Sequence, residues 1–114
     1  DPMHMTVEGG LSGWEMGLDL IAPWVSLVGI KNFRWKPVGR DKQGQMQFRT
    51  EYVPLADGQA PLPRFMKRLE GLKYNGTVSL HSEYKGGSSF RSLSSTELLE
   101  QSAVDLKYLK TVVK

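Results

Sequence analysis

The chain has 114 residues, a formal net charge of +3 and no cysteine. This length allows a single domain over residues 1–114 and falls well short of the roughly 250 residues of a complete α/β barrel. The lack of cysteine excludes a disulfide framework, a thiolate nucleophile and a thiolate zinc site, and it is compatible with a reducing compartment. We therefore expect a cytoplasmic protein, unless an amino-terminal export signal is missing from this chain.

The distribution of charge and hydropathy limits the partners. The basic residues are scattered over predicted helices and loops, as on a solvated surface, and do not form the stripe that binds nucleic acid. No apolar run approaches the about 20 residues that cross a bilayer. We therefore expect neither nucleic acid nor a membrane as a partner.

The first predicted helix runs from about Ser12 to Ala22. Gly9-Gly10 breaks the backbone before it, and Ser12 with Glu15 matches a capping box. Apolar residues then recur at spacings of four and three, which marks one face of a helix: Trp14, Leu18 and Ile21. Pro23 is expected to end this helix, because proline cannot continue the backbone hydrogen bonds.

A predicted buried strand, Val25–Phe33, follows almost at once, since its apolar run shows no alternation. A long polar connection from Lys36 to about Ala60 comes next, and within it Met46–Val53 is predicted to be an extended arm. Long loops in compact domains are often functional. We therefore interpret the connection as a lid over a ligand site.

The second half of the chain predicts a helix, a strand and a further helix. Leu62–Leu72 carries an apolar stripe, and Thr77–Glu83 is the second strand. Ser94 and Glu97 match another capping box, which would open a last helix over Ser94–Val113. The expected buried face of that helix consists of Leu98, Leu99, Ala103, Leu106, Leu109 and Val113. The alternation of helices and strands predicts an α/β architecture.

Polar side chains follow each predicted strand. Lys31 ends the first strand, and His81 and Glu83 end the second with the same strand parity. Asp1 and His4 form a third polar group at the start of the chain. The carboxyl ends of parallel strands meet at one edge of a sheet, where α/β folds place their ligand sites. We therefore expect the side chains that follow the two strands to lie close together.

Two strands alone do not make a stable parallel sheet, because both edges keep unpaired backbone groups. The chain therefore either pairs with copies of itself as a homo-oligomer or is the carboxyl-terminal part of a longer protein, and its start at Asp1 favours the second. As an isolated piece it is expected to be marginally stable or to associate. In both cases we expect Val25–Ile30 and Thr77–Leu80 to be adjacent and parallel, with the helix at 62–72 as a right-handed crossover.

Short motifs in a set order carry a resemblance: Asp1-Pro2-Met3-His4, Glu8-Gly9-Gly10, Val28-Gly29-Ile30-Lys31-Asn32, and Tyr74-Asn75-Gly76-Thr77-Val78-Ser79-Leu80-His81 with Glu83. Over nearly its whole length the chain resembles the last third of the sugar phosphate isomerase/epimerase family, whose members are xylose-isomerase-like (β/α)8 barrels. The resemblance implies a partial TIM barrel made of the last β/α units. Val25–Phe33 would be strand seven, Thr77–Glu83 strand eight and Ser94–Val113 the closing helix.

The resemblance also implies an activity, namely isomerisation or epimerisation of a sugar or sugar phosphate by proton transfer next to the carbonyl of a ketose. A divalent metal (Mn, Zn or Mg) would polarise the sugar oxygens, and carboxylates would take and return the proton. Asp1 matches the family's metal-binding aspartate, and His4 matches its substrate-contacting histidine. Gly29 stands where the family has a metal histidine, and His81 where it has an acid.

The resemblance implies that Asp1, His4, Lys31, His81 and Glu83 converge at the carboxyl ends of the two strands. The resulting candidates fall into three groups. The expected metal ligands are Asp1, His81 and Glu83, whose oxygen and imidazole donors suit these metals. The expected catalytic residues are Glu83, His4 and Lys31. The expected substrate contacts are His4, Lys31, Arg34 and Trp35, the last by stacking on a sugar face. For Lys31 two interpretations stay open: it binds a phosphate, carboxylate or enolate oxygen, or it pairs structurally with Glu83.

Two classes of function remain open. The first is an isomerase or epimerase that is active only in full-length form, with this chain alone inactive. The second is a non-catalytic carbohydrate-binding barrel in which Gly29 marks a degenerate metal site. A metal-dependent DNA-repair endonuclease on the same barrel would need many histidines, and this chain has only two.

Overall fold

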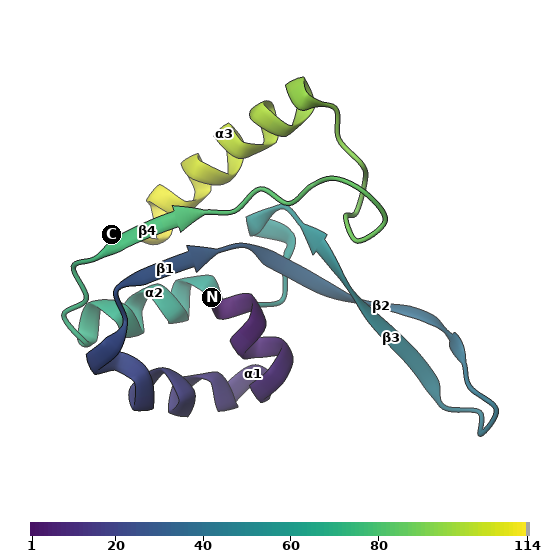
Figure 1. Cartoon of the computed structure of the whole chain (residues 1–114), viewed down its shortest axis with the longest axis horizontal. Coiled ribbons are helices and arrows are strands. Elements are labelled where there is room, and N and C mark those ends of the chain that lie inside the picture. Colours follow the sequence, from purple (N-terminus) through teal and green to yellow (C-terminus); the bar gives the residue numbers. More distant parts are fainter. Residues whose placement is uncertain (114) are drawn as a thin grey trace.

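The computed structural model describes residues 1–113 and has a mixed α/β fold with two small sheets (Figure 1). The strands are β1 (Leu27–Ile30), β2 (Asn32–Arg40), β3 (Met46–Val53) and β4 (Thr77–Leu80). The helices are α1 (Pro2–Ile21), α2 (Leu62–Gly71) and α3 (Ser95–Val112), with short 3-10 turns η1 (Ala22–Trp24) and η2 (Leu55–Asp57). None of the helices within residues 1–113 has both the length and the apolar character that would let it cross a membrane.

The two apolar strands pair as expected. β1 and β4 are adjacent and parallel, with Val28 opposite Val78 and Ile30 opposite Leu80. The backbone N–H of His81 donates to the carbonyl of Ile30 at 2.9 Å, which extends the pairing one residue beyond β4. The parallel pair is therefore confirmed, and it leaves Lys31 and His81 at the same edge of the sheet.

The strand predicted over Val25–Phe33 is wrong in its extent. The chain leaves the parallel sheet at Lys31, and β2 pairs antiparallel with β3 along most of the predicted polar connection. Asp41 shapes the turn by accepting from the N–H groups of Gln43 and Gln45 at 3.0 and 2.9 Å, and Gly44 supplies a φ of 81° that glycine adopts without strain.

This β2–β3 hairpin projects away from the helices (Figure 1), so it is not a lid closed over the strand ends. One face carries the apolar side chains of Trp35 and Phe48, and the other carries the charged side chains of Arg34, Lys36 and Glu51. Pairing between the two strands gives this segment a regular structure, where the sequence predicted a polar connection.

Helix α1 begins ten residues earlier than its apolar pattern predicts. The Asp1 side chain accepts from the N–H groups of Met3 and His4, and Pro2 occupies the first turn, where its missing N–H costs nothing. The expected break is present as a kink at Gly10, with φ 76° and ψ −178°. Ser12 lies inside the helix, so the capping box predicted there is wrong.

The other two helices follow the prediction more closely. Helix α2 matches its expected span, and Leu62, Phe65, Met66 and Leu69 are buried. The capping box at the start of α3 is confirmed by two reciprocal hydrogen bonds between Ser94 and Glu97. The expected buried face of α3 is mostly wrong, because Leu99, Ala103, Leu106 and Val113 are exposed and only Leu109 is fully buried.

An internal polar network explains which side of α3 faces the protein. Asp105, which is 1% exposed, accepts from the N–H of Leu55 at 3.1 Å, from the amide of Gln101 at 3.1 Å and from the hydroxyl of Tyr84. The Tyr84 hydroxyl also lies 3.3 Å from the carbonyl of Val53. Burial and the neighbouring carboxylate raise the pKa of Tyr84. This Asp105 network ties α3 to η2 and to the segment after β4.

The apolar core lies where β1 meets α1 and α2. Its members are Met3, Trp14, Leu18, Val28, Ile30, Phe33, Leu55, Ala60, Leu62, Phe65, Met66, Leu69 and Leu109. Trp14 packs on Phe65 with their ring centroids 5.6 Å apart. The core therefore fixes the start of α1 against the end of β1, and this packing positions Asp1 beside Lys31.

Candidate functional site

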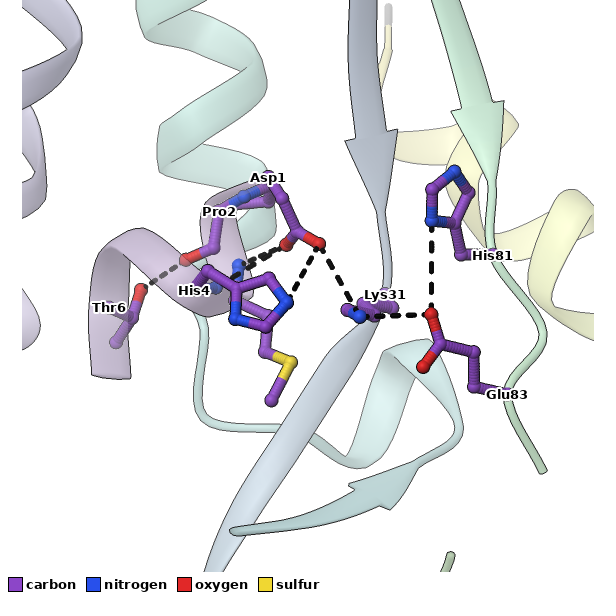
Figure 2. A network of polar contacts seen from close by, with 8 residues as sticks. Asp1, Pro2, His4, Thr6, Lys31, His81 and Glu83 are labelled. Carbon is purple, nitrogen blue, oxygen red and sulfur yellow. Dashed lines mark hydrogen bonds and ion pairs between the residues drawn. The ribbon is translucent and has the colours of Figure 1, made fainter. Parts of the chain in front are cut away.

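Lys31 lies between β1 and β2, and its ammonium group is held by two acidic side chains (Figure 2). Its Nζ donates to Glu83 Oε1 at 2.9 Å and lies 3.8 Å from Asp1 Oδ2. The side chain is only 9% exposed. Because a nearly buried charge needs partners, the two carboxylates account for the position of the ammonium.

The two carboxylate oxygens of Asp1 make different contacts. Oδ1 accepts from the N–H of Met3 at 2.8 Å and from the N–H of His4 at 3.4 Å, which caps α1. Oδ2 points toward Lys31 and lies 3.8 Å from His4 Nε2 (Figure 2). The helix start therefore orients a carboxylate oxygen and an imidazole toward the strand ends.

Glu83 and His81 enter the cluster from the segment after β4. His81 Nδ1 lies 4.0 Å from Glu83 Oε1, the oxygen that also accepts from Lys31. Burial raises the pKa of Glu83, but the hydrogen bond and charge of Lys31, with smaller effects of Tyr52 and His81, lower it below its ordinary value. Glu83 is therefore ionised at neutral pH, and its side chain is 43% exposed and can reach a ligand.

Gly29 makes room for the imidazole of His81. A Cβ atom placed on Gly29 would lie 2.9 Å from His81 Cε1, closer than real Cβ atoms approach, and 3.2 Å from its Nε2, which is also tight. The imidazole thus lies against the backbone of β1 and occupies the space that any side chain at residue 29 would need. In this chain the histidine beside the end of β1 is therefore His81, which follows β4.

The structure brings together the five side chains that were expected to converge. Asp1, His4, Lys31, His81 and Glu83 form a chain of contacts between 2.9 and 4.0 Å (Figure 2). We call this set the Lys31 cluster. Their catalytic and ligand-binding roles stay predictions.

Tyr52 also lies beside Lys31, and the sequence did not suggest it as a neighbour. Lys31 Nζ lies 5.1 Å from the centroid of its ring, a distance at which a cation and an aromatic ring attract. Tyr52 belongs to β3 and pairs with Phe33 of β2. Recognition of the hairpin would have found it, since the pairing places Tyr52 at the hairpin base beside Lys31.

Two predicted substrate contacts do not join the cluster. The guanidinium of Arg34 pairs with Glu51 at 2.6 Å on the charged face of the hairpin. Trp35 packs edge to face on Phe33, with ring centroids 5.5 Å apart, on the opposite face. Both side chains follow Lys31 on β2, and the hairpin carries them away from the strand ends.

The predicted metal ligands are near one another but do not surround one point. Within residues 1–113 no group of three histidine or acidic side chains is arranged to hold an ion. The ammonium of Lys31 lies between the carboxylates of Asp1 and Glu83, where a cation bound to both would be. The roles of Asp1, His81 and Glu83 as metal ligands therefore stay predictions.

Comparisons of the chain with protein-family models, with curated proteins and with solved structures gave no match. The functional argument therefore depends on the geometry and chemistry of the Lys31 cluster. That cluster offers a fixed cationic donor, ionised carboxylates and two imidazoles at one edge of a parallel sheet.

Proposed function

We propose that the Lys31 cluster binds a hydroxylated carbonyl compound of the sugar or sugar phosphate class and transfers a proton next to its carbonyl, as an isomerase or epimerase does. One observation supports this above all. A nearly buried ammonium is held between two carboxylates at the carboxyl ends of adjacent parallel strands. Groups at such strand ends converge on one ligand in α/β folds.

The proposed roles follow from charge and position. Glu83 takes the proton from the carbon next to the carbonyl, the C–H electron pair shifts toward the carbonyl oxygen, and an enediolate forms. Lys31 stabilises the negative oxygen by hydrogen bonding, since a charged donor held in place needs little reorganisation. Return of the proton to the neighbouring carbon, or to the other face of the same carbon, gives the isomer or epimer.

The two histidines flank this centre. The His4 side chain is 51% exposed and lies 3.8 Å from Asp1, so it can contact a substrate hydroxyl and carry a proton between oxygens. His81 lies 4.0 Å from Glu83 and orients that carboxylate. In this scheme Asp1 holds both His4 and the ammonium.

We also propose that β1 and β4 are strands seven and eight of a (β/α)8 barrel, with this chain as its carboxyl-terminal part. The parallel pair, the helix α2 between its strands and the polar groups at its carboxyl edge support this architecture. The remaining β/α units would cover the exposed edges of the sheet and contribute further groups to the site.

The test is solvent deuterium exchange in the intact protein that contains this chain. The protein is incubated in D2O with a panel of ketoses, aldoses and their phosphates, and NMR follows loss of the proton next to the carbonyl. We expect exchange with at least one sugar and its loss in the Glu83→Gln variant. Arg68→Gln, which breaks the Arg68–Asp19 pair between α2 and α1, is the matched control.

A non-catalytic carbohydrate-binding protein is the second candidate, and Gly29 favours it. The resemblance places a metal ligand at this position, whereas glycine has no side chain to offer. Saturation-transfer NMR with the same sugars distinguishes the two. Binding of a sugar without deuterium exchange supports the binding protein, and exchange that is unchanged in Glu83→Gln contradicts the roles given above.

A further inference from the structure

We propose that the Lys31 ammonium takes the place of a divalent metal in this site, so that the intact protein binds its carbonyl substrate without a metal ion between Asp1 and Glu83. This inference deepens the proposed function and rests on it for the identity of the substrate. Its physical basis, the position of the ammonium between two acidic side chains, is independent of any assay of turnover.

The ammonium already occupies the position between the two carboxylates. Nζ lies 2.9 Å from Glu83 Oε1 and 3.8 Å from Asp1 Oδ2, on a side chain that is almost fully buried. A divalent ion bound to the same two oxygens would lie within a few ångströms of a positive charge. Coulomb repulsion at such a distance is strong in a partly buried site. The two carboxylates therefore bind one cation, and that cation is the ammonium of Lys31.

The third expected ligand is also occupied. The imidazole of His81 lies against Gly29, and the glutamate oxygen nearest its Nδ1 is the oxygen that Lys31 uses. To approach a metal, His81 would have to leave the space above Gly29, and Glu83 would have to exchange its ammonium partner for the ion. The arrangement therefore favours contacts among Lys31, Glu83 and His81 over coordination of a metal ion.

An aromatic ring adds to the contacts of the Lys31 ammonium. The ring of Tyr52 covers one side of the ammonium, with its centroid 5.1 Å away, and the attraction between cation and ring adds to that of the carboxylates. The ammonium donates a hydrogen bond to Glu83 Oε1 at 2.9 Å and has further N–H donors for a ligand oxygen. The ligand class that fits is a carbonyl compound with an adjacent hydroxyl, whose oxygen accepts from Nζ.

The experiment is a Mn²⁺ titration of the intact protein, followed by electron paramagnetic resonance of the free ion, without any substrate. Four proteins are compared: wild type, Lys31→Gln, Lys31→Arg and the Lys31→Gln/Glu83→Gln double variant. Lys31→Gln removes the charge and frees two carboxylates, whereas Lys31→Arg keeps a cation in place. Circular dichroism and thermal unfolding establish that each variant is folded.

We expect Lys31→Gln to bind Mn²⁺ at least about tenfold more tightly than wild type, which corresponds to a measurable change in the free ion. Lys31→Arg should behave like wild type, and the double variant should lose the gain. Tight binding of one Mn²⁺ by wild type, abolished by Asp1→Asn or Glu83→Gln, would overturn the proposal. An equal affinity of wild type and Lys31→Gln would also overturn it, because Lys31 would then not exclude the ion.

The titration separates this proposal from the proposed function. If no sugar exchanges deuterium but Lys31→Gln gains the Mn²⁺ site, the function fails and the role of Lys31 as the resident cation stands. If exchange occurs and is abolished by a chelator, the function stands and the present inference fails. Exchange that a chelator leaves unchanged supports both.

Discussion

Glu83 and Tyr84 are neighbours in the chain, yet they enter two polar clusters of opposite character. Glu83 turns toward the Lys31 cluster, where its side chain is 43% exposed. Tyr84 turns toward the Asp105 network, where both partners are almost completely buried. Successive residues of an extended segment point to opposite sides, so one short segment after β4 supplies both.

The contacts in the two clusters differ in length and completeness. In the Asp105 network the carboxylate has three donors within hydrogen-bond distance, so no group is left for a ligand. In the Lys31 cluster one contact is 2.9 Å and three lie between 3.8 and 4.0 Å. Longer contacts beside solvent leave donors and acceptors that a ligand can use. We conclude that the first cluster stabilises the fold and the second is available for function.

Loss of turnover without loss of the fold is the largest effect expected from this comparison. In the intact protein, Glu83→Gln should lower the rate of deuterium exchange by about 10²–10⁴-fold, because it removes the proposed general base. Its unfolding free energy should fall by less than that of Asp105→Ala, because the side-chain amide oxygen of the variant can still accept from Lys31 Nζ and Asp1 stays 3.8 Å from the ammonium. The two quantities are measured by NMR exchange and by urea unfolding. A large loss of stability with turnover retained would reverse the assignment of the two clusters.

The reverse pattern is expected for the Asp105 network. Asp105→Ala should lower the unfolding free energy by about 3 kcal/mol, because it leaves the Leu55 N–H buried without a partner and leaves the Tyr84 hydroxyl only the carbonyl of Val53 at 3.3 Å. Asp105→Asn, which keeps the shape and an acceptor, should cost less. Urea unfolding of both variants measures the difference, and an equally stable Asp105→Ala protein would show that water replaces the carboxylate.

Alanine substitutions at two glycines test how firmly the neighbouring side chains, Asn32 and His81, are held in place. A Cβ on Gly58 would lie 2.0 Å from the side chain of Asn32, which is buried and hydrogen-bonded to Leu55 and Ala60, so Gly58→Ala should cost about 2 kcal/mol. Gly29→Ala should cost less, because the imidazole of His81 is half exposed and can move. Thermal unfolding measures both, and the NMR shifts of His81 should change only in Gly29→Ala. Equal costs would show that His81 is as fixed as Asn32.

The smallest effect expected is a difference in the acid sensitivity of stability. The pKa of Glu83 is lowered from its ordinary 4.5: burial raises it, but Lys31, Tyr52 and His81 together lower it by more. A lowered pKa means that this carboxylate stabilises the fold above pH 4.5 and that the contribution is lost as the pH falls through its folded value. The pKa of Glu51 is lowered in the same sense by Arg34 and Lys36, against the effect of its burial.

Urea unfolding at a series of pH values from neutral to acidic measures this slope. Glu83→Gln should lose less stability on acidification than wild type does, and Glu51→Gln should behave likewise. Asp19→Asn, at an exposed pair away from both groups, serves as the control. A slope that is the same in wild type and Glu83→Gln would mean that Lys31 does not lower the pKa of Glu83.

The sequence by itself determined the local elements whose signals lie within a few residues. The apolar runs at β1 and β4, the stripe of α2 and the capping box of Ser94 and Glu97 all predicted what is observed. The convergence of Lys31 and Glu83 was also predictable, because parallel strands place their carboxyl ends together. Asp1 reaches them from the start of α1.

Only the tertiary structure decided which conformation a segment adopts where its local sequence allows several. The β2–β3 hairpin replaced a predicted loop, since its weak strand signals are stabilised by pairing across the turn. Asp105 became buried because Tyr84 and Leu55, 21 and 50 residues away, supply its donors. The place of His81 above Gly29 and of Tyr52 beneath Lys31 likewise depends on contacts between distant segments. Such contacts leave no periodic pattern in the chain, because the partners of a buried polar group are set by packing between segments and not by their spacing in the sequence.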